Sequence, residues 1–337
     1  MQFPRPNFAH LLSLSGPFGT YEHADHSLAR VEHGYCTDDV ARVLMVAARE
    51  SNPDREVADL ARSSVRFLDA AQDANGQFRN RRLSSGTWFG PATSDDCWGR
   101  AMWALGTTIA RAGDSDLRLD ALRLFNRGAT ARSNWPRSMA FATFGAAEVL
   151  RVDSSNQGAL RLIASSAEVL DRPERSRRWQ WPEERLTYAN AALAEALMAA
   201  GSCLGSDRLV ESGLRQLKWL LEMESTDGHL SVTPAVGRGP QSDGRKFDQQ
   251  PIEVAAMSDA CARAFDLTGD GEWRTGQDLA VQWFLGKNDV GALMYDPQTG
   301  GGYDGLTASG PNLNQGAEST IALLTTLQGA RRFAKAV

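Results

Sequence analysis

Hydrophobic residues recur at helical spacing along almost the whole chain, and the helices they predict are of two alternating kinds. Helices of the first kind are apolar on most of their circumference and rich in Ala and Gly, which indicates burial on several sides. They cover residues 40–48, 98–110, 139–150, 191–200, 254–265 and 319–330. Helices of the second kind carry an apolar stripe opposite Arg, Asp and Glu, which is typical of a helix with one face in water. They cover residues 55–72, 117–128, 157–170, 207–222 and 272–285.

This alternation predicts helical hairpins with an inner and an outer member. The inner helices begin near residues 38, 95, 137, 187, 251 and 316, a loose period of the kind found in repeat architectures. Six hairpins closing into a ring form an all-α fold, the (α/α)6 toroid, and we expect residues 1–337 to form one such domain. Only five outer helices are predicted for six inner ones. The sixth outer helix either comes from the N-terminal segment 1–30, around Phe8 to Ser15, or is missing. An open solenoid is the competing architecture.

The connections between the helices favour the closed ring. Links from an inner to an outer helix are short, whereas those from an outer to the next inner helix are long and contain Gly, Trp and carboxylates. The long links cover residues 74–94, 171–187, 225–250 and 287–315. Long loops confined to one face are usually functional. We expect them to wall a cleft around the N-terminal ends of the inner helices.

Composition narrows the class of protein. Of the 337 residues, 42% are hydrophobic and 23% charged, so the chain can build a large core. The net charge is -5 and no long Lys/Arg run occurs, which argues against nucleic acid or an anionic membrane as a partner. No stretch approaches the roughly 18 apolar residues of a membrane helix, and the first 15 residues lack a continuous apolar core. We therefore expect a cytoplasmic protein.

The four cysteines stand singly, and we expect reduced, mostly buried thiols. The alternative is that Cys36 and Cys97, each beside an Asp pair, join a metal site or a redox pair. Neither CxxC nor HExxH occurs, so the chain is predicted to need no metal or other cofactor.

Polar residues cluster where the long loops enter the inner helices, in HGYCTDD, SDDCWGR, WQWPEERLTY, FDQQPIE and NLNQGAES. Helix capping explains one carboxylate at each start. It explains less well the adjacent Asp pairs, the Gln-Gln pair and the Trp-x-Trp motif. We therefore expect a ligand pocket on this face. The candidate binding residues are His33, Tyr35, Arg42, Trp98, Arg100, Trp179, Trp181, Tyr188, Asp248, Gln249, Gln250, Tyr303, Asp304, Asn314 and Gln315.

Carboxylates, amides and tryptophans together favour a carbohydrate, since sugar hydroxyls pair with polar groups and pyranose faces stack on indole. Trp88, Trp98, Trp179 and Trp181 are the candidate platforms. Cleavage of a glycosidic bond commonly uses two carboxyl groups, one of them an acid that keeps its proton near neutral pH.

Glu183, beside Trp181 and Pro182, is the preferred acid, with Glu184 as the neighbour most easily confused with it. Asp39 is the preferred base, and its rivals are Asp38, Asp96 and Glu318. Arg42 and Arg100 lie one helical turn beyond the Asp pairs and could hold one member ionised.

Other functions are open. A sugar epimerase on the same toroid would use His33 and His229 as a pair, and a non-catalytic glycan-binding protein would keep only the Trp and amide contacts. A GxSxG elbow and a phosphate-binding GxxxxGK[ST] loop are absent.

The motifs HGYCTDDVAR, DDCWGRAMWALG, WQWPEERLTYANA, DQQPIE, YDPQTGGGYDGL and NQGAEST resemble a bacterial family of six-hairpin, glycosidase-like proteins. The resemblance covers about residues 8–330. It implies an (α/α)6 toroid that works on a glycan. Members of this family are often fused to or encoded beside glycosyltransferases, so an association with a glycosyltransferase is implied as well, although this chain has no such domain.

More distant resemblances point to different catalytic pairs. YCTDDVAR resembles the Asp-Asp helix start of toroidal mannanases, which implies Asp38 with Asp39. WPEE and NQGAEST resemble the acid and base regions of inverting, glucoamylase-type toroids, which implies Glu183 with Glu318. From these observations together, we expect a glycoside hydrolase that cleaves an oligosaccharide or polysaccharide with inversion of the anomeric centre.

Overall fold

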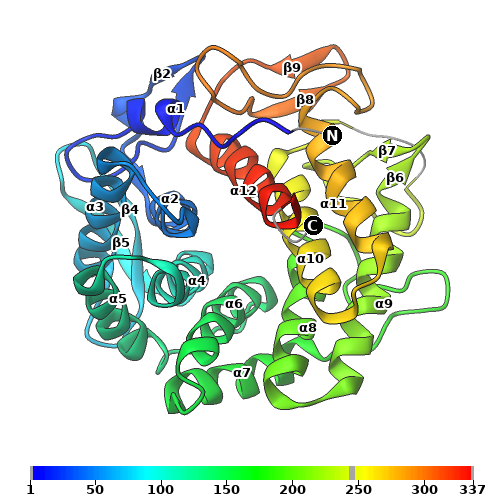
Figure 1. The fold of residues 1–337 in the computed structure, drawn as a ribbon, viewed down its shortest axis with the longest axis horizontal. Coiled ribbons are helices and arrows are strands. Elements are labelled where there is room, and N and C mark those ends of the chain that lie inside the picture. The colour runs from blue at the N-terminus through cyan, green and yellow to red at the C-terminus, as the bar shows by residue number, and fades with distance from the viewer. Residues whose placement is uncertain (1–2, 243–246, 335–337) are drawn as a thin grey trace.

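The helices form a closed double ring. A computed structural model describes residues 3–242 and 247–334, and within these ranges six inner helices surround the centre of the molecule (Figure 1). They are α2 (Thr37–Arg49), α4 (Asp96–Arg111), α6 (Pro136–Val152), α8 (Ala191–Leu204), α10 (Pro251–Thr268) and α12 (Ala317–Ala334). Each inner helix contacts the next, and the last of them, α12, contacts α2. The inner ring is therefore closed, as the sequence pattern predicts.

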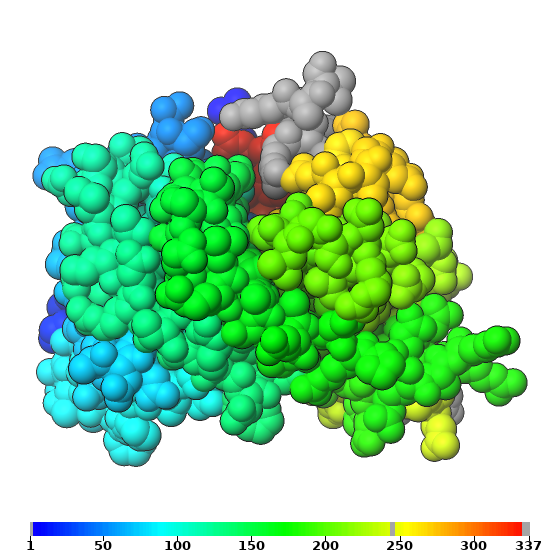
Figure 2. Space-filling model, turned by 90° about the horizontal axis from the view of Figure 1, so that it is seen from below, coloured from blue at the N-terminus to red at the C-terminus, as the bar shows by residue number. Residues whose placement is uncertain are grey.

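The outer helices pack behind the inner ones, and successive hairpins follow one another around the rim (Figure 2). They are α3 (Arg55–Ala71), α5 (Ser115–Gly128), α7 (Gln157–Leu170), α9 (Asp207–Met223) and α11 (Gly271–Phe284). Their bounds lie within two residues of the predicted ones. The short helix α1 (Ala9–Ser13) contacts α12 and α3, at the place where a sixth outer helix would stand.

The long outer-to-inner connections are not plain loops, because they contain short antiparallel strands that the sequence pattern did not predict. A three-stranded sheet combines β3 (Tyr35–Cys36), β4 (Phe78–Arg82) and β5 (Trp88–Thr93). Three hairpins pair β1 (Ala24–Asp25) with β2 (Leu28–Ala29), β6 (Ser225–Thr226) with β7 (His229–Leu230), and β8 (Gly305–Thr307) with β9 (Gly310–Asn312). A 3-10 turn covers Val31–His33. β3 and β4 contact the inner helix α2, and β4 also contacts α4, whereas β6 and β7 contact the outer helices α9 and α11.

None of the helices in the part of the chain that the structure describes is long and apolar enough to cross a bilayer.

Glycines allow two inner helices to lie unusually close. A Cβ atom added at Gly106 of α4 would clash with the backbone oxygen of Gly145 on α6, and one added at Gly145 would clash with the backbone oxygen of Met102. Gly99 faces the backbone of Ser138 in the same way. Because backbone atoms cannot move aside as a flexible side chain can, this contact depends on the missing side chains. It brings the starts of α4 and α6 together beside the ring axis.

We expect Gly145→Ala to lower the free energy of unfolding by about 1–3 kcal/mol, because the added methyl group overpacks a contact between two backbones. Gly113→Ala is the matched control, since no atom lies within 4 Å of a Cβ at that position. Chemical denaturation of both variants measures the difference. Equal stability of Gly145→Ala and Gly113→Ala would show that the helices can separate without cost.

Candidate active site

A cavity of about 430 Å³ opens at the N-terminal ends of the inner helices. We call it the acidic cavity. Of the described residues that line it, six are carboxylates and three are arginines, namely Glu22, Asp38, Asp39, Asp96, Asp304 and Glu318 with Arg42, Arg81 and Arg100. His23, Cys36, Tyr188, Gln250, Ile252, Gly316 and Ser319 complete the lining. The structure thus brings together acidic residues from the starts of α2, α4 and α12, as the sequence indicated.

Helix capping does not account for these carboxylates. The outer helices, except α9, begin after an Asp or Asn whose side chain accepts a hydrogen bond from the first turn. The residues before α2, α4, α6, α8 and α10 make no such side-chain bond. The first-turn carboxylates Asp38, Asp39 and Asp96 contact the cavity instead, where the positive ends of the helix dipoles favour negative charge.

Arg42 connects two carboxylates of the acidic cavity. Its Nη2 donates to Asp39 Oδ1, and its Nη1 donates to Glu318 Oε2 at 2.8 Å. Arg42 and Asp39 are buried, whereas the side chain of Glu318 is 41% exposed. Arg42 therefore fixes an exposed carboxylate at the cavity surface.

The two partners of Arg42 differ in their affinity for a proton. Burial raises the pKa of Asp39 to about 7, and the negative charges of Glu318, Glu22 and Asp38 add to this effect while Arg42 opposes it. For Glu318, desolvation also favours the neutral acid, but Arg42 and Arg100 outweigh it, so its pKa is lowered. The cavity therefore contains both a carboxyl group that can hold a proton near neutral pH and a carboxylate that stays ionised.

Arg100 and Cys36 hold Asp38 between them. Arg100 Nε lies 3.4 Å from Asp38 Oδ1, and its guanidinium group lies over the ring of Phe141. The thiol of Cys36 donates to Asp38 Oδ2 at 3.5 Å. The side chain of Asp38 is 18% exposed, which leaves it accessible from the cavity.

Asp96 is held by two hydroxyl groups. Ser138 Oγ and Tyr188 Oη each donate to one of its oxygens at 2.7 Å. Ser138 comes from α6 and Tyr188 from the turn before α8, so three hairpins meet at this carboxylate. A carboxylate held in this way can orient a hydroxyl group of a bound ligand.

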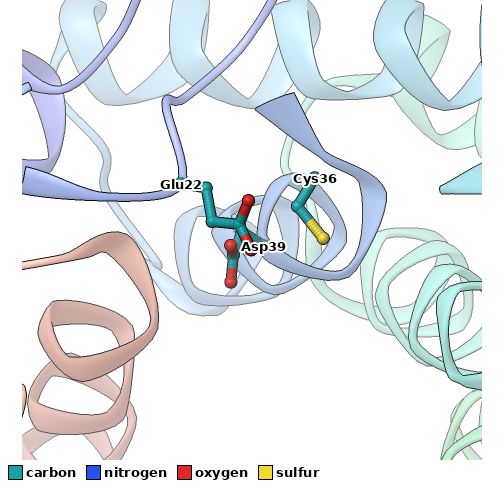
Figure 3. A group of neighbouring side chains, drawn as sticks. All are labelled: Glu22, Cys36 and Asp39. Atoms are coloured by element: carbon teal, nitrogen blue, oxygen red, sulfur yellow. The ribbon is translucent and has the colours of Figure 1, made fainter. Parts of the chain in front are cut away.

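Glu22, Cys36 and Asp39 offer three ligand atoms within 4.8 Å of one another (Figure 3). Such a group has the composition of a metal site, but an arginine already binds each of its two carboxyl groups. Arg81 pairs with Glu22, and Arg42 pairs with Asp39. The donor set therefore does not fit a bound cation well. Cys36 and Cys97 are both buried free thiols.

Five of the predicted binding residues lie in the core instead of the cavity. Tyr35, Trp98, Trp181 and Gln249 are completely buried, and Trp179 is 3% exposed. The indole groups of Trp98 and Trp179 donate to backbone oxygens, of Gly128 and Glu183 respectively, and Trp181 stacks on Trp219. All five are buried in the core and none lines the acidic cavity, so the prediction that they contact a ligand there is wrong. Trp88, half-buried against Phe67 and Arg82, does not line the cavity either.

Glu183, the preferred acid, is also placed elsewhere. It does not line the acidic cavity, and its two oxygens accept hydrogen bonds of 2.8 and 2.9 Å from the guanidinium of Arg137. Arg137 also donates to the backbone oxygen of Tyr188 and to Asn190 Oδ1. This bidentate pair supports the turn that presents Tyr188 to Asp96. Glu184 is exposed and pairs with Arg175.

The histidine pair of the epimerase hypothesis does not form. His229 Nε2 lies 2.8 Å from Asp289 Oδ1, and neither His229 nor His33 lines the acidic cavity. His33 Nδ1 instead lies 3.0 Å from the ring of His23, which does line it.

The remaining predicted residues divide between lining and support. Gln250 and Asp304 line the cavity, and Asp304 accepts hydrogen bonds from Gly316 N and Ser319 Oγ. Gln315 is buried and holds the loop before α12 through Thr299. Four predicted residues do not line the cavity, namely His33, Asp248, Tyr303 and Asn314. Tyr303 and Asn314 are half-buried, and Asp248 is exposed.

Sequence reasoning missed Glu22, His23 and Arg81. Glu22 and His23 precede β1, and Arg81 lies on β4 where it pairs with Cys36 of β3. None of them lies at a helix start. The search for polar residues at the starts of the inner helices, which found the other residues, could therefore not find these. The three arginines among residues 79–82 were the one available signal.

Comparison with known proteins agrees with the fold. No family model matches the chain, and no curated protein matches it by sequence. Among solved structures, a sugar epimerase from a ruminal bacterium aligns with 96% of this chain and 95% of its own at 14% identity and a TM-score of 0.71. A cellobiose 2-epimerase from Spirochaeta thermophila aligns over 97% and 93% of the two chains at 14% identity and a TM-score of 0.65. A GH76 α-mannanase from Bacteroides thetaiotaomicron aligns over 96% and 92% at 10% identity and a TM-score of 0.65.

These structures are (α/α)6 toroids, and the chain has the same fold. They include both epimerases and a glycoside hydrolase, so the shared fold shows the architecture and leaves the reaction open.

We expect Glu183→Gln to destabilise the protein by about 2–3 kcal/mol, because it leaves the buried guanidinium of Arg137 without its charged partner. Glu184→Gln, one residue away and 79% exposed, should change stability by less than about 0.5 kcal/mol. Thermal or chemical denaturation of both variants tests this. A Glu183→Gln protein of normal stability that has lost its activity would restore Glu183 as a catalytic acid.

Proposed function

We propose that the chain is a glycoside hydrolase that cleaves an oligosaccharide in the acidic cavity. The observation that carries the proposal is the joining of Asp39 and Glu318 through Arg42, which places a proton-holding carboxyl group and an ionised carboxylate in one cavity. Hydrolysis of a glycosidic bond commonly needs such a pair, one group to protonate the leaving oxygen and one to activate water. The lining contains more carboxylates than arginines, and this surplus of negative charge favours a carboxyl group that keeps its proton. The charge balance therefore supports the hydrolase proposal.

Glu318 is the proposed base. Its side chain is 41% exposed, compared with 18% for Asp38 and 4% for Asp39. The ion pair with Arg42 keeps it ionised and limits its rotation. An exposed, oriented carboxylate can accept a proton from a water molecule as that water attacks the anomeric carbon.

The Asp38–Asp39 pair is the proposed source of the acid proton. Asp39 holds a proton to about pH 7 because it is buried, and Asp38 is the more exposed member beside it. The pair protonates the glycosidic oxygen while the bond from that oxygen to the anomeric carbon breaks and water forms the new bond. Solvent then returns a proton to the pair and removes one from Glu318. A single displacement of this kind inverts the anomeric centre.

Asp96 and Tyr188 are the proposed substrate-orienting residues. Together with Gln250 and Asp304 they line other parts of the same cavity and offer both acceptors and donors to sugar hydroxyls. Because the predicted tryptophans are buried, we infer recognition mainly through these polar groups and through Ile252.

A sugar epimerase is the second candidate function, and His23 is the observation that favours it. His23 lines the acidic cavity and contacts His33, so an imidazole is available near the carboxylates to move a proton on a sugar carbon. Epimerisation through such a step exchanges solvent deuterium into the product at that carbon, whereas hydrolysis does not.

We expect Glu318→Gln to lower the rate of oligosaccharide hydrolysis by about 10²- to 10⁴-fold, because it removes the base while keeping the shape of the side chain. A panel of oligosaccharides, analysed by mass spectrometry for released fragments, gives the rate. Thermal melts establish that the variant is folded, because it also removes one charged partner of the buried Arg42, and Glu184→Gln should keep full activity. Undiminished hydrolysis by Glu318→Gln, or deuterium incorporation without cleavage, would contradict the proposal.

We expect kcat/KM to fall as the pH rises through about 7, because Asp39, whose pKa burial raises to about 7, then loses the proton that the acid supplies. Asp39→Asn should be slower and should lose this part of the pH profile. His23→Gln is the control, because His23 also lines the cavity, and it should keep the decline near pH 7. The same midpoint in wild type and Asp39→Asn would mean that Asp39 is not the titrating group.

A further inference from the structure

A second cavity lies at the opposite end of the ring axis, where the inner helices end. It has a volume of about 330 Å³, and we call it the rear cavity. Every inner helix contributes to its lining, through Arg49, Arg111, Glu148, Glu195, Asp259 and Gln328. None of these residues takes part in the reaction proposed above.

The two cavities are separated by an apolar neck. A space of only about 40 Å³ lies between them, and Met45, Phe141, Phe144 and Ile321 are among the side chains that enclose it. It shares Arg42 and Arg100 with the acidic cavity, and Trp103, Glu195 and Asp259 with the rear cavity. A space of this size admits a few water molecules but no sugar ring. A ligand in the rear cavity is therefore not a substrate on its way to Glu318.

The charges of the rear cavity are balanced. Its described lining contains five arginines and five carboxylates, and most of them form ion pairs across helices. Arg49 pairs with Asp259 at 3.0 Å, and Arg263 pairs with Glu195 at 2.9 Å. Because the arginines are neutralised and the carbonyl ends of the helices carry partial negative charge, an anionic ligand is disfavoured. A neutral, polar ligand fits this lining.

Two oxygens in the lining accept no hydrogen bond from any residue that the structure describes. They are Glu148 Oε2, which forms an ion pair with Arg151 Nη2 at 3.2 Å, and Gln328 Oε1. Gln328 uses its amide nitrogen instead, to bind Val46 O and Glu50 Oε1. A ligand hydroxyl that reaches either oxygen supplies a hydrogen-bond donor that the lining lacks. Neighbouring hydroxyls could also accept from the guanidinium groups.

We propose that the rear cavity is a second ligand site that binds a neutral polyhydroxylated molecule of the size of a monosaccharide. Its volume lies at the lower end of the range of small-molecule pockets. The inference uses no residue of the proposed catalytic machinery, so it stands or falls separately from the hydrolase.

Binding of D-glucose, D-mannose, D-galactose and myo-inositol tests this site, with sodium sulfate as an anionic comparison. Isothermal titration and saturation-transfer NMR on the full chain measure the affinity. We compare wild type with Ala147→Trp, which fills the rear cavity from α6, and Glu148→Gln, which removes one carboxylate oxygen. Glu184→Gln is the control, and thermal melts establish that each variant is folded.

We expect at least one of the four polyols to bind wild type at a site that Ala147→Trp abolishes, with oligosaccharide hydrolysis retained. Glu148→Gln should weaken this binding about tenfold, the effect of one hydrogen bond to a charged group. Failure of all four polyols to bind there, binding that Ala147→Trp leaves unchanged, or binding of sulfate in their place would overturn the proposal. Loss of hydrolysis in Glu318→Gln with rear-site binding intact would separate the two sites.

Discussion

The guanidinium of Arg42 joins the first inner helix to the last. It lies on α2 and binds Glu318 on α12, so a single side chain connects elements at the two ends of the chain where the ring closes. The same side chain fixes the 41%-exposed carboxylate of Glu318 and binds Asp39, which is buried beside it. Arg42 therefore contributes to the closure of the ring, together with the bonds of Gln328 to Val46 and Glu50, and it also shapes the site, because its removal would leave two carboxyl groups without their partner.

The two rings use their helix starts differently. In the outer ring the short turns supply Asp or Asn side chains that cap the helices locally, as at Asp54 and Asp270. In the inner ring the carboxylates lie inside the first turn and contact residues from other hairpins, as Asp96 contacts Ser138 and Tyr188. Asp96 and Glu318 are thus held by long-range contacts, whereas Asp39 is held by Arg42 of its own helix.

Helical periodicity and loop length were sufficient to predict the ring of helices and the acidic residues at the helix starts. The pattern of buried positions indicates where each inner helix lies and therefore where it begins. They could not tell which way a residue in a first turn points. Successive residues of a helix are rotated by about 100°, so Trp98, two positions after Asp96, faces α5 while Asp96 faces the axis. Glu183 was misread for a related reason, since its partner Arg137 is 46 residues away. Glu22 and Arg81 depend on strand pairing, which short polar segments do not reveal.

The central claim is that Glu318 and the Asp38–Asp39 pair lie on either side of the bond that is cleaved. A crystal structure of the Glu318→Gln protein with an uncleaved oligosaccharide tests it most directly. The account predicts a glycosidic oxygen within about 3 Å of a carboxyl oxygen of the Asp38–Asp39 pair, with the side chain of residue 318 on the other side of the sugar ring. A sugar bound outside the acidic cavity, or one whose glycosidic bonds contact neither side chain, would contradict it.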